Sequence, residues 1–246
     1  MITGHQLLLP LLFFINETSV LPPSVCPAAD APAVKRTWLP KDSTQLHPVL
    51  ELKAPASVVS EKSEGYEATV IVKTRTGHGS GFAITNDGYI ITAYQAIDPD
   101  AEHGNSGVTI ITSEGEEIGA VVLRGSAYSG LALIKTEKQF PKAFTCPLVK
   151  QFKPLQSVYS VGASISLDLG QSVSPGMISN ERIIEGAPRL QLNMSVNYGM
   201  SGAPVFDDKG MLHGVVVSKL TGENTEGVSF AVPAYLIADY LNIHFY

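Results

Sequence analysis

The sequence predicts an all-β fold: two packed six-stranded antiparallel β-barrels followed by a short C-terminal helix. About twelve short apolar runs, rich in β-branched residues, alternate with turn-forming residues along the chain. The 22 glycines and 16 prolines among 246 residues are typical of many turns and short strands. The runs fall into two groups, joined by a proline-containing connection over residues 141–154. No unit repeats with a period of about 20 to 50 residues, which excludes solenoids and propellers.

The first barrel is expected between about residues 66 and 138. Asn86-Asp87-Gly88 is a strong hairpin signal, because these residue types accept the positive φ angles of tight turns. Glu114-Gly115 marks a further turn. The expected strands are Ala68–Lys73, Phe82–Ile84, Tyr89–Ala93, Val108–Thr112, Ile118–Leu123 and Leu131–Lys135.

The second barrel is expected between about residues 155 and 232. After it, Pro233 precedes the helix expected over Ala234–Leu241, because proline suits a first helical turn and the apolar residues that follow share one face. The expected strands are Ser157–Ala163, Gln171–Ser179, Leu190–Met194, Ala203–Phe206, Leu212–Ser218 and Val228–Val232.

The N-terminal region is expected to lie outside the barrels. Leu7–Ile15 is an apolar run of signal-peptide length and Ala29-Asp30-Ala31 fits a cleavage site, although Met1–Gln6 contains no lysine or arginine. Residues 1–31 are therefore interpreted as a signal peptide, which predicts a secreted, periplasmic or lumenal protein. The alternative expectation is an N-terminus that is not cleaved or is disordered. Residues 32–63, rich in Pro, Ala and Ser, are expected to be a linker mostly without regular structure.

Composition argues against several function classes. The net charge is −6 and no basic block occurs, so the basic face that nucleic-acid binding needs is missing. No apolar run reaches about 18 residues, so no membrane-spanning helix is expected. The six histidines show no metal-ligand spacing, and we expect neither a metal nor a cofactor. Cys26 and Cys146 could form a disulfide, but a leader cysteine and a packed thiol are the favoured reading.

The stretch Asn197–Pro204 carries the strongest chemical signal. Its Gly-Met-Ser-Gly turn lets the backbone fold closely behind Ser201 and push the hydroxyl outward. The backbone N–H groups of Gly199 and Ser201 could then form an oxyanion hole. A Gly-x-Ser-x-Gly nucleophile elbow is set aside, because Pro204 and a strand follow where that elbow needs a helix. Serine alone is a weak nucleophile, so it needs a base and a group that orients the base.

Several segments of the chain, in the same order, resemble the motifs of chymotrypsin-fold serine proteases of the HtrA/Deg type. The family patterns are Gly-Ser-Gly-Phe, Asp-Gly-Tyr-Ile-Leu-Thr, Asp-Leu-Ala-Leu-Leu-Lys, Gly-Gln-Thr-Val-Thr-x-Gly-Ile-Val-Ser, Asn-Pro-Gly-Asn-Ser-Gly-Gly-Pro and Gly-Ile-Gly-Phe-Ala-Ile-Pro. The resemblance spans about residues 66 to 241 and implies a trypsin-like domain over residues 64–246. The matching segments are Gly79–Phe82, Asp87–Thr92, Leu131–Lys135, Gly170–Ser179, Asn197–Pro204 and Gly227–Pro233.

Two of the three catalytic positions of the family carry different residues in this chain. The family's catalytic histidine falls in a Thr-x-x-His pattern, and Gln95 occupies that place here. The family's aspartate precedes Leu-Ala-Leu, and Gly130 occupies that place. Only Ser201 matches. Loss of the base in a related hydrolase costs roughly a factor of 10⁶ in turnover, so no efficient peptide hydrolysis is expected.

The resemblance also implies where a ligand would bind. Val216, Val217 and Ser218 would line one wall of a small apolar substrate pocket, with Ser195 near its base. The strand edge around Val215–Ser218 could accept an extended peptide by strand addition. The family often carries a C-terminal PDZ domain, and none is expected here after the helix.

Three functional hypotheses follow. The leading one is a pseudoprotease that binds an extended peptide or an unfolded protein segment. The second is an active serine endopeptidase with a non-standard base, supplied from an unexpected place in the chain or by a partner chain. His103 in the loop after Gln95 is the first candidate within the chain, although a solvated loop histidine is the favoured interpretation of it. The third is a purely structural interaction domain, which predicts no affinity for extended peptides.

Overall fold

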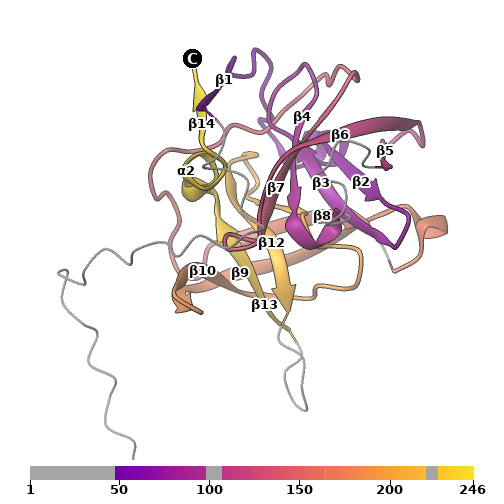
Figure 1. Cartoon of the computed structure of the whole chain (residues 1–246). Helices are drawn as coiled ribbons and strands as arrows, with labels where there is room; N and C mark the ends of the chain where they lie inside the picture. The colour runs from indigo at the N-terminus through magenta and orange to yellow at the C-terminus, as the bar shows by residue number, and fades with distance from the viewer. Residues whose placement is uncertain (1–47, 98–106, 164, 220–226) are drawn as a thin grey trace, which may run out of the picture. The chain divides into compact units, whose positions relative to one another are not determined.

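The computed structural model describes residues 48–97, 107–163, 165–219 and 227–246, with only the backbone of residues 218 and 219 (Figure 1). The expected signal peptide, the first half of the expected linker (residues 32–47) and His103 therefore lie outside the described residues. Within the described part, no helix is long and apolar enough to cross a membrane.

The first barrel is a closed, six-stranded antiparallel sheet with strand order β2-β3-β4-β7-β6-β5. Its interior holds β-branched side chains that alternate inward along each strand, among them Val70, Ile90 and Ile134. The turn at residues 86–88 joins β3 to β4, as the hairpin signal predicted. The strands are β2 (Thr69–Lys73), β3 (His78–Ala83), β4 (Tyr89–Ala93), β5 (Val108–Ile111), β6 (Glu117–Ser126) and β7 (Leu131–Thr136).

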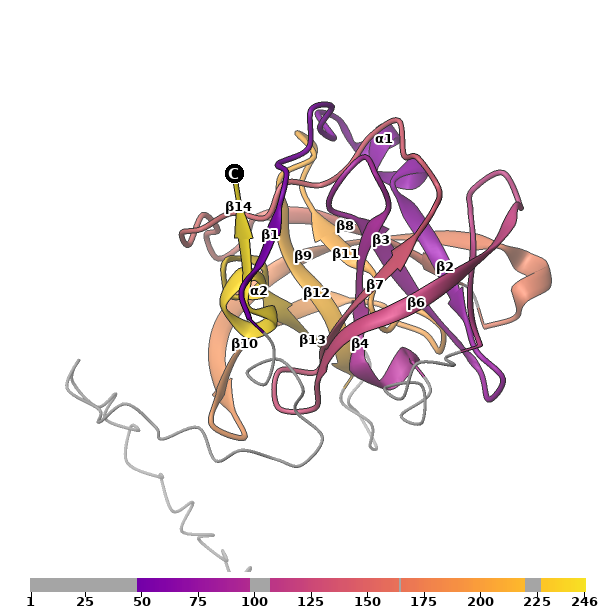
Figure 2. The same ribbon diagram turned by 45° about the horizontal axis from the view of Figure 1, so that its top comes forward.

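The second barrel is also closed and six-stranded, with strand order β10-β13-β12-β11-β8-β9. It has its own interior, which includes Val158, Leu190 and Val216. The all-β class and the pair of barrels that the sequence predicted are confirmed (Figure 2). The strands are β8 (Ser157–Ala163), β9 (Gln171–Ile184), β10 (Ala187–Met194), β11 (Pro204–Phe206), β12 (Leu212–Lys219) and β13 (Val228–Pro233).

A third apolar cluster joins the two barrels. Phe82 of the first barrel packs edge-on against Phe144, with ring centroids 5.4 Å apart, and Phe144 packs against Phe206 of the second barrel. All three rings are fully buried, which fixes how the barrels face one another. Cys146 lies in the same cluster as a free thiol, and burial raises its pKa to about 12.

The C-terminal helix is split. The predicted span begins as a 3₁₀ turn, η4 (Ala234–Leu236), and continues as α2 (Ile237–Leu241). Asn242 then ends the helix in the left-handed conformation at φ 51°. A short strand, β14 (Ile243–Phe245), follows and was not expected from the sequence. The described residues also include the 3₁₀ turns η1 (Tyr94–Ala96) and η3 (Leu167–Leu169).

Part of the expected linker is packed onto the domain. Strand β1 (Leu50–Leu52) pairs in parallel with β14, as Figure 2 shows, and helix α1 (Lys62–Glu67) leads into β2. Leu52 is 2% exposed and Val59 is 6% exposed, so this segment contributes to the core. The expectation of irregular structure is therefore corrected for residues 50–52 and 62–63. The strand at residues 50–52 was not predicted because three residues give too little periodicity to detect.

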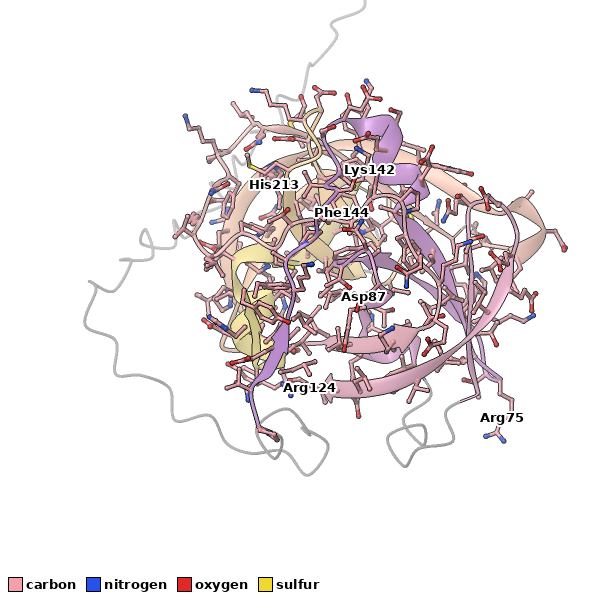
Figure 3. The ribbon with its side chains drawn as sticks, turned by 90° about the horizontal axis from the view of Figure 1, so that it is seen from above. Arg75, Asp87, Arg124, Lys142, Phe144 and His213 are labelled. Atoms are coloured by element: carbon pink, nitrogen blue, oxygen red, sulfur yellow. The ribbon has the colours of Figure 1, made fainter. Side chains whose placement is uncertain are left out.

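Arg124 of β6 holds this terminal arrangement together (Figure 3). Its guanidinium donates to the carbonyls of Leu241 at 2.8 Å, Asn242 at 2.6 Å and Pro48 at 2.5 Å. The residue is only 5% exposed, and burial lowers the pKa of the guanidinium. One buried cation thus ties the start of the described chain to the end of α2.

Candidate active site

The turn that carries Ser201 lies between β10 and β11 and depends on two glycines. Gly199 has a φ of 94° and Gly202 a φ of 92°, values that residues with a side chain rarely adopt. A Cβ on Gly202 would lie 2.0 Å from the backbone oxygen of Ser80. The glycines therefore allow the serine turn to press directly against β3 of the first barrel.

Ser80 fixes the serine turn from behind. It is fully buried, its backbone N–H donates to the Ser201 carbonyl at 2.7 Å, and its hydroxyl donates to the Gly199 carbonyl at 2.7 Å. The same hydroxyl accepts from the N–H of Ala163 in β8 at 2.8 Å. The sequence placed Ser80 in a family motif but indicated no role for it. A sequence pattern does not distinguish a buried hydroxyl from an exposed one.

Gln95, in η1, reaches the serine. Its Nε2 donates to Ser201 Oγ at 3.2 Å and also to the carbonyl oxygen of Val217. A carbonyl only accepts hydrogen bonds, so the nitrogen end of the amide must be the end that points here. The serine oxygen is therefore held by a donor and not by a base.

Gly130 lies beside the 3₁₀ turn η1, which carries Gln95. Its carbonyl accepts from the N–H of Tyr94 at 2.8 Å, which places it directly behind η1. Gly130 has a φ of 79°, and a Cβ there would meet Cγ1 of Val217 at 3.5 Å. The structure thus brings Ser201, Gln95 and Gly130 together, with no carboxylate at Gly130.

The two backbone donors proposed for an oxyanion hole have no acceptor in the described part of the chain. Within the described residues, neither the N–H of Gly199 nor that of Ser201 donates a hydrogen bond to the chain. Met200, between them, donates to the Asn197 carbonyl at 3.2 Å and so closes the turn. The turn therefore leaves two donors, one on each side of Met200, for a ligand or for water.

A cavity of about 300 Å³ adjoins Ser201. One wall is the aromatic pair His78 and Tyr198, whose rings meet edge-on with centroids 5.3 Å apart. Tyr198 is 61% exposed, so its ring is available to a ligand. The lining consists of Thr74, Thr76, Gly77, His78, Gln95, Ala96, Tyr198, Gly199 and Ser201.

The residues expected to form a substrate pocket do not line this cavity. The Val216 side chain is buried in the core of the second barrel, and the Val217 side chain in the cluster between the barrels. Ser195 is exposed, and only the backbone of Ser218 is described. Val217 contributes its backbone instead: a register shift between Val216 and Ser218 frees its carbonyl to meet Gln95.

Residues 79–215, more than half of the chain, match the family model of the trypsin-like peptidase domain. The chain belongs to the trypsin-like peptidase family. It is 30% identical over 168 residues to a probable periplasmic serine endoprotease DegP-like of Rhizobium meliloti (strain 1021), covering 65% of this chain and 32% of that protein. A DegP-like relative of Halomonas elongata is 28% identical over 170 residues, covering 67% and 34%. This trypsin-like domain thus spans about a third of the curated relatives' length.

Solved structures support the same fold for the trypsin-like domain. The serine endoprotease from Yersinia pestis superposes with a TM-score of 0.60 at 24% identity, over 73% of this chain and 66% of that one. The HtrA-type protease AlgW with tripeptide gives 0.62 at 21% identity, over 72% and 60%. These two neighbours show that the domain has the fold of these proteases, and its sequence is similar to that of the DegP-like relatives.

The described histidines of this domain differ in their surroundings. His213 is buried, and its Nε2 lies 3.2 Å from Asp207 Oδ2 and 3.0 Å from Gln156 Nε2. Burial lowers the pKa of His213, against an opposing effect of Asp207. His78 alone among the described histidines lines the cavity beside Ser201.

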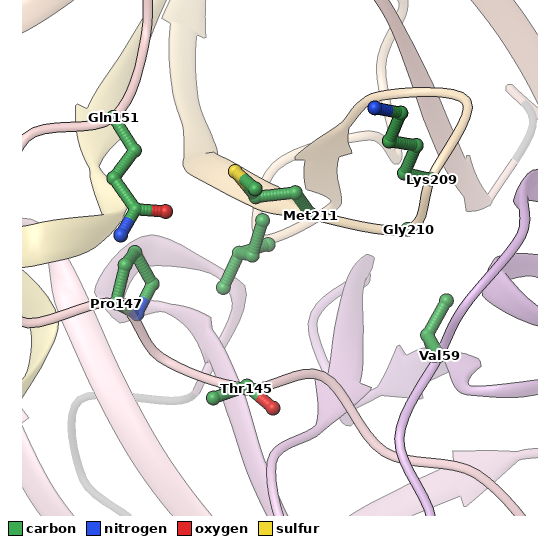
Figure 4. Close-up of a pocket in the computed structure, with 8 residues that line it drawn as sticks. Val59, Thr145, Pro147, Gln151, Lys209, Gly210 and Met211 are labelled. Carbon is green, nitrogen blue, oxygen red and sulfur yellow. The ribbon is translucent and has the colours of Figure 1, made fainter.

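A second cavity of about 270 Å³ is drawn in Figure 4. It shares no residue with the cavity beside Ser201, and the exposed Gln151 stands at its rim opposite Lys209. The lining consists of Val59, Thr145, Pro147, Gln151, Lys209, Gly210, Met211 and Leu212.

Proposed function

We propose that this trypsin-like domain binds extended peptides or unfolded protein segments and does not hydrolyse them efficiently. The observation that carries the proposal is the Gln95 amide, whose nitrogen lies 3.2 Å from Ser201 Oγ, where a base is required. An amide has no useful basicity near neutral pH, so it cannot take the serine proton. Gly130 offers no carboxylate to orient a base.

The relatives and the geometry support a peptide as the ligand. The curated relatives are named serine endoproteases, and one structural neighbour was solved with a tripeptide. In this chain, Val215 pairs with β11, and Val216 exchanges hydrogen bonds with Gly202 and Ala203. A peptide would therefore be added to the β12 edge beyond Val216, next to Ser201.

The location of the protein follows from the same relatives. The DegP-like proteins are named periplasmic, and the N-terminal apolar run has signal-peptide length. We infer a secreted, periplasmic or lumenal protein, and cell fractionation of the full chain tests this inference.

The decisive experiment compares the full chain with Ser201→Ala. We expect neither protein to cleave an unfolded protein substrate, and no labelling of Ser201 by a fluorophosphonate probe. Both proteins should bind a pool of fluorescent peptides in an anisotropy titration. Cleavage by the wild type alone would overturn the pseudoprotease, and absence of peptide binding would favour a purely structural domain.

An active endopeptidase is the second candidate function, and His78 is the observation that favours it. His78 and Ser201 line the same cavity, so an imidazole from β3 is the described base candidate. If it acts as the base, fluorophosphonate labelling of Ser201 occurs in the wild type and disappears in His78→Asn. Labelling that survives in His78→Asn excludes His78 as the base.

A further inference from the structure

The backbone carbonyls around Ser201 already have donors. The Gly199 carbonyl accepts from Ser80 Oγ, and the Ser201 carbonyl accepts from the Ser80 N–H, both at 2.7 Å. The carbonyl of Val216 accepts from the N–H of Gly202 at 2.7 Å. The carbonyl that the β12 irregularity turns toward the site, that of Val217, accepts from Gln95.

Three hydrogen-bond donors of the site, in contrast, have no acceptor among the described residues. Within the described chain, the N–H groups of Gly199 and Ser201 have no acceptor. The Ser201 hydroxyl accepts from Gln95 at 3.2 Å, so its own proton remains for another partner. Three donors thus belong to two residues that line one cavity, Gly199 and Ser201, while the carbonyls of the same two residues are occupied.

This excess of free donors over free backbone acceptors at Gly199 and Ser201 favours a ligand group that only accepts hydrogen bonds. The described residues that line the cavity include no aspartate and no glutamate, so none of them repels an anion. A carboxylate accepts through both oxygens and is bound about twice as strongly by such donors as a neutral carbonyl. An internal peptide segment would also bring backbone N–H groups, and Gln95 already occupies the Val217 carbonyl that would receive one of them.

We propose that the site beside Ser201 recognises the C-terminal carboxylate of a peptide, with the last side chain in the cavity lined by His78 and Tyr198. The proposal rests on the proposed peptide-binding function and narrows its ligand to chain ends. The cavity of about 300 Å³ is at the small end of ligand sites, which suits one terminal residue. The exposed Tyr198 ring gives that residue an apolar contact that acetate or phosphate could not use.

The test uses the full chain and one pool of fluorescent hexapeptides made twice, as free acids and as C-terminal amides. We expect the acid pool to bind at least about tenfold more tightly, because charge-assisted hydrogen bonds replace neutral ones. Equal affinity of the two pools would overturn the carboxylate proposal and leave peptide binding standing. Failure of both pools to bind would overturn the proposed function itself.

Sodium acetate, added at constant ionic strength, separates a peptide end from a free small carboxylate. We expect acetate to displace the acid pool only at concentrations far above those of the peptide. Displacement by acetate at the same concentration as the peptide would overturn the peptide end as the ligand.

A charge substitution supplies the matched control. Gln95→Glu places an acceptor and a negative charge beside Ser201, so the preference for acids should fall about tenfold or more. Gln151→Glu makes the same change at the other cavity and should leave the preference unaltered. An equal loss in both variants would attribute the effect to net charge and overturn the assignment of the site.

Discussion

Gln95 and Gly130 change the serine site in different ways. Gln95 donates a hydrogen bond to Ser201 Oγ at 3.2 Å, so it orients the serine from the position where a base would stand. Gly130 keeps its backbone bond to Tyr94 but contributes no side chain. Its φ of 79° would strain an aspartate by about 1 kcal/mol, although aspartate tolerates this region better than most residues. Restoring a base is therefore easier than restoring the whole triad.

Gln95→His should give weak cleavage of an unfolded protein substrate, because an imidazole would then stand within reach of Ser201 without a carboxylate to orient it. A missing carboxylate costs about 10⁴ in turnover in serine proteases of known mechanism, so the rate should stay about that far below a complete triad. Initial cleavage rates measure the effect, with Ser201→Ala added to Gln95→His as the control.

Adding Gly130→Asp to Gln95→His should raise the rate further. The new Cβ meets Val217 Cγ1 at an ordinary contact distance of 3.5 Å, so the side chain has room to enter. A rate for the double variant no higher than that of Gln95→His would indicate that a carboxylate at residue 130 cannot reach the base position.

At the scale of elements, β3 supports the site through Ser80. Its hydroxyl links the carbonyl of Gly199 to the N–H of Ala163, and thus the serine turn to strand β8. Ser160, also on β8, provides a contrast, because its buried hydroxyl has no hydrogen-bond partner within the described residues. Two buried serines therefore differ in whether the domain uses their hydroxyl.

Ser80→Ala should lower the free energy of unfolding by about 1–3 kcal/mol, because it leaves a buried donor and a buried acceptor unsatisfied. Ser160→Ala removes only an unsatisfied group and should be neutral or slightly stabilising. Urea denaturation of both variants measures the difference. A similar loss in the two would mean that the Ser80 hydrogen bonds add nothing beyond side-chain volume.

Arg124→Met should release β1 from β14, since three carbonyls lose their charged donor. We expect unfolding to become easier by roughly 2–4 kcal/mol and amide exchange to accelerate in residues 50–52 and 243–245. Arg182→Met, on an exposed arginine of β9, is the control and should change neither quantity. Unchanged exchange in Arg124→Met would show that the parallel pair is stable without the guanidinium.

These elements also indicate what the sequence could predict. The strands Tyr89–Ala93 and Ser157–Ala163 lie where the apolar runs and turns predicted them, because each has local periodicity and a clear turn signal. The parallel pair β1 and β14 joins residues about 190 positions apart, and neither strand is long enough to show a pattern. At the site, sequence located Ser201, Gln95 and Gly130, but the hydrogen bonds of Ser80 and the cavity wall of His78 and Tyr198 depend on tertiary packing.

At the scale of the whole domain, stability depends on polar groups that the cores enclose. His213, in β12, is buried, and its imidazole contacts the partly buried side chains of Asp207 and of Gln156, which lies beside the start of β8. The Asp207 carboxylate also accepts from the N–H groups of Lys209 and Met211, each at 3.0 Å, and so closes the turn between β11 and β12. This cluster couples the protonation of one side chain to the integrity of the second barrel.

The domain should therefore lose stability as the pH falls below about 6.5, the ordinary pKa of histidine. Burial lowers the pKa of His213 in the folded state, so the unfolded chain binds the proton more readily and acid favours unfolding. Glu64, whose pKa is lowered to about 2 by Lys142 and Ser60, adds to the loss only below about pH 4.5.

Thermal unfolding between about pH 7.5 and pH 5.5 thus separates the contribution of His213 from that of Glu64. We expect the fall in Tm to be smaller in His213→Gln than in the wild type or in His244→Gln, an exposed histidine of β14. Equal falls in all three proteins would assign the acid sensitivity to other groups.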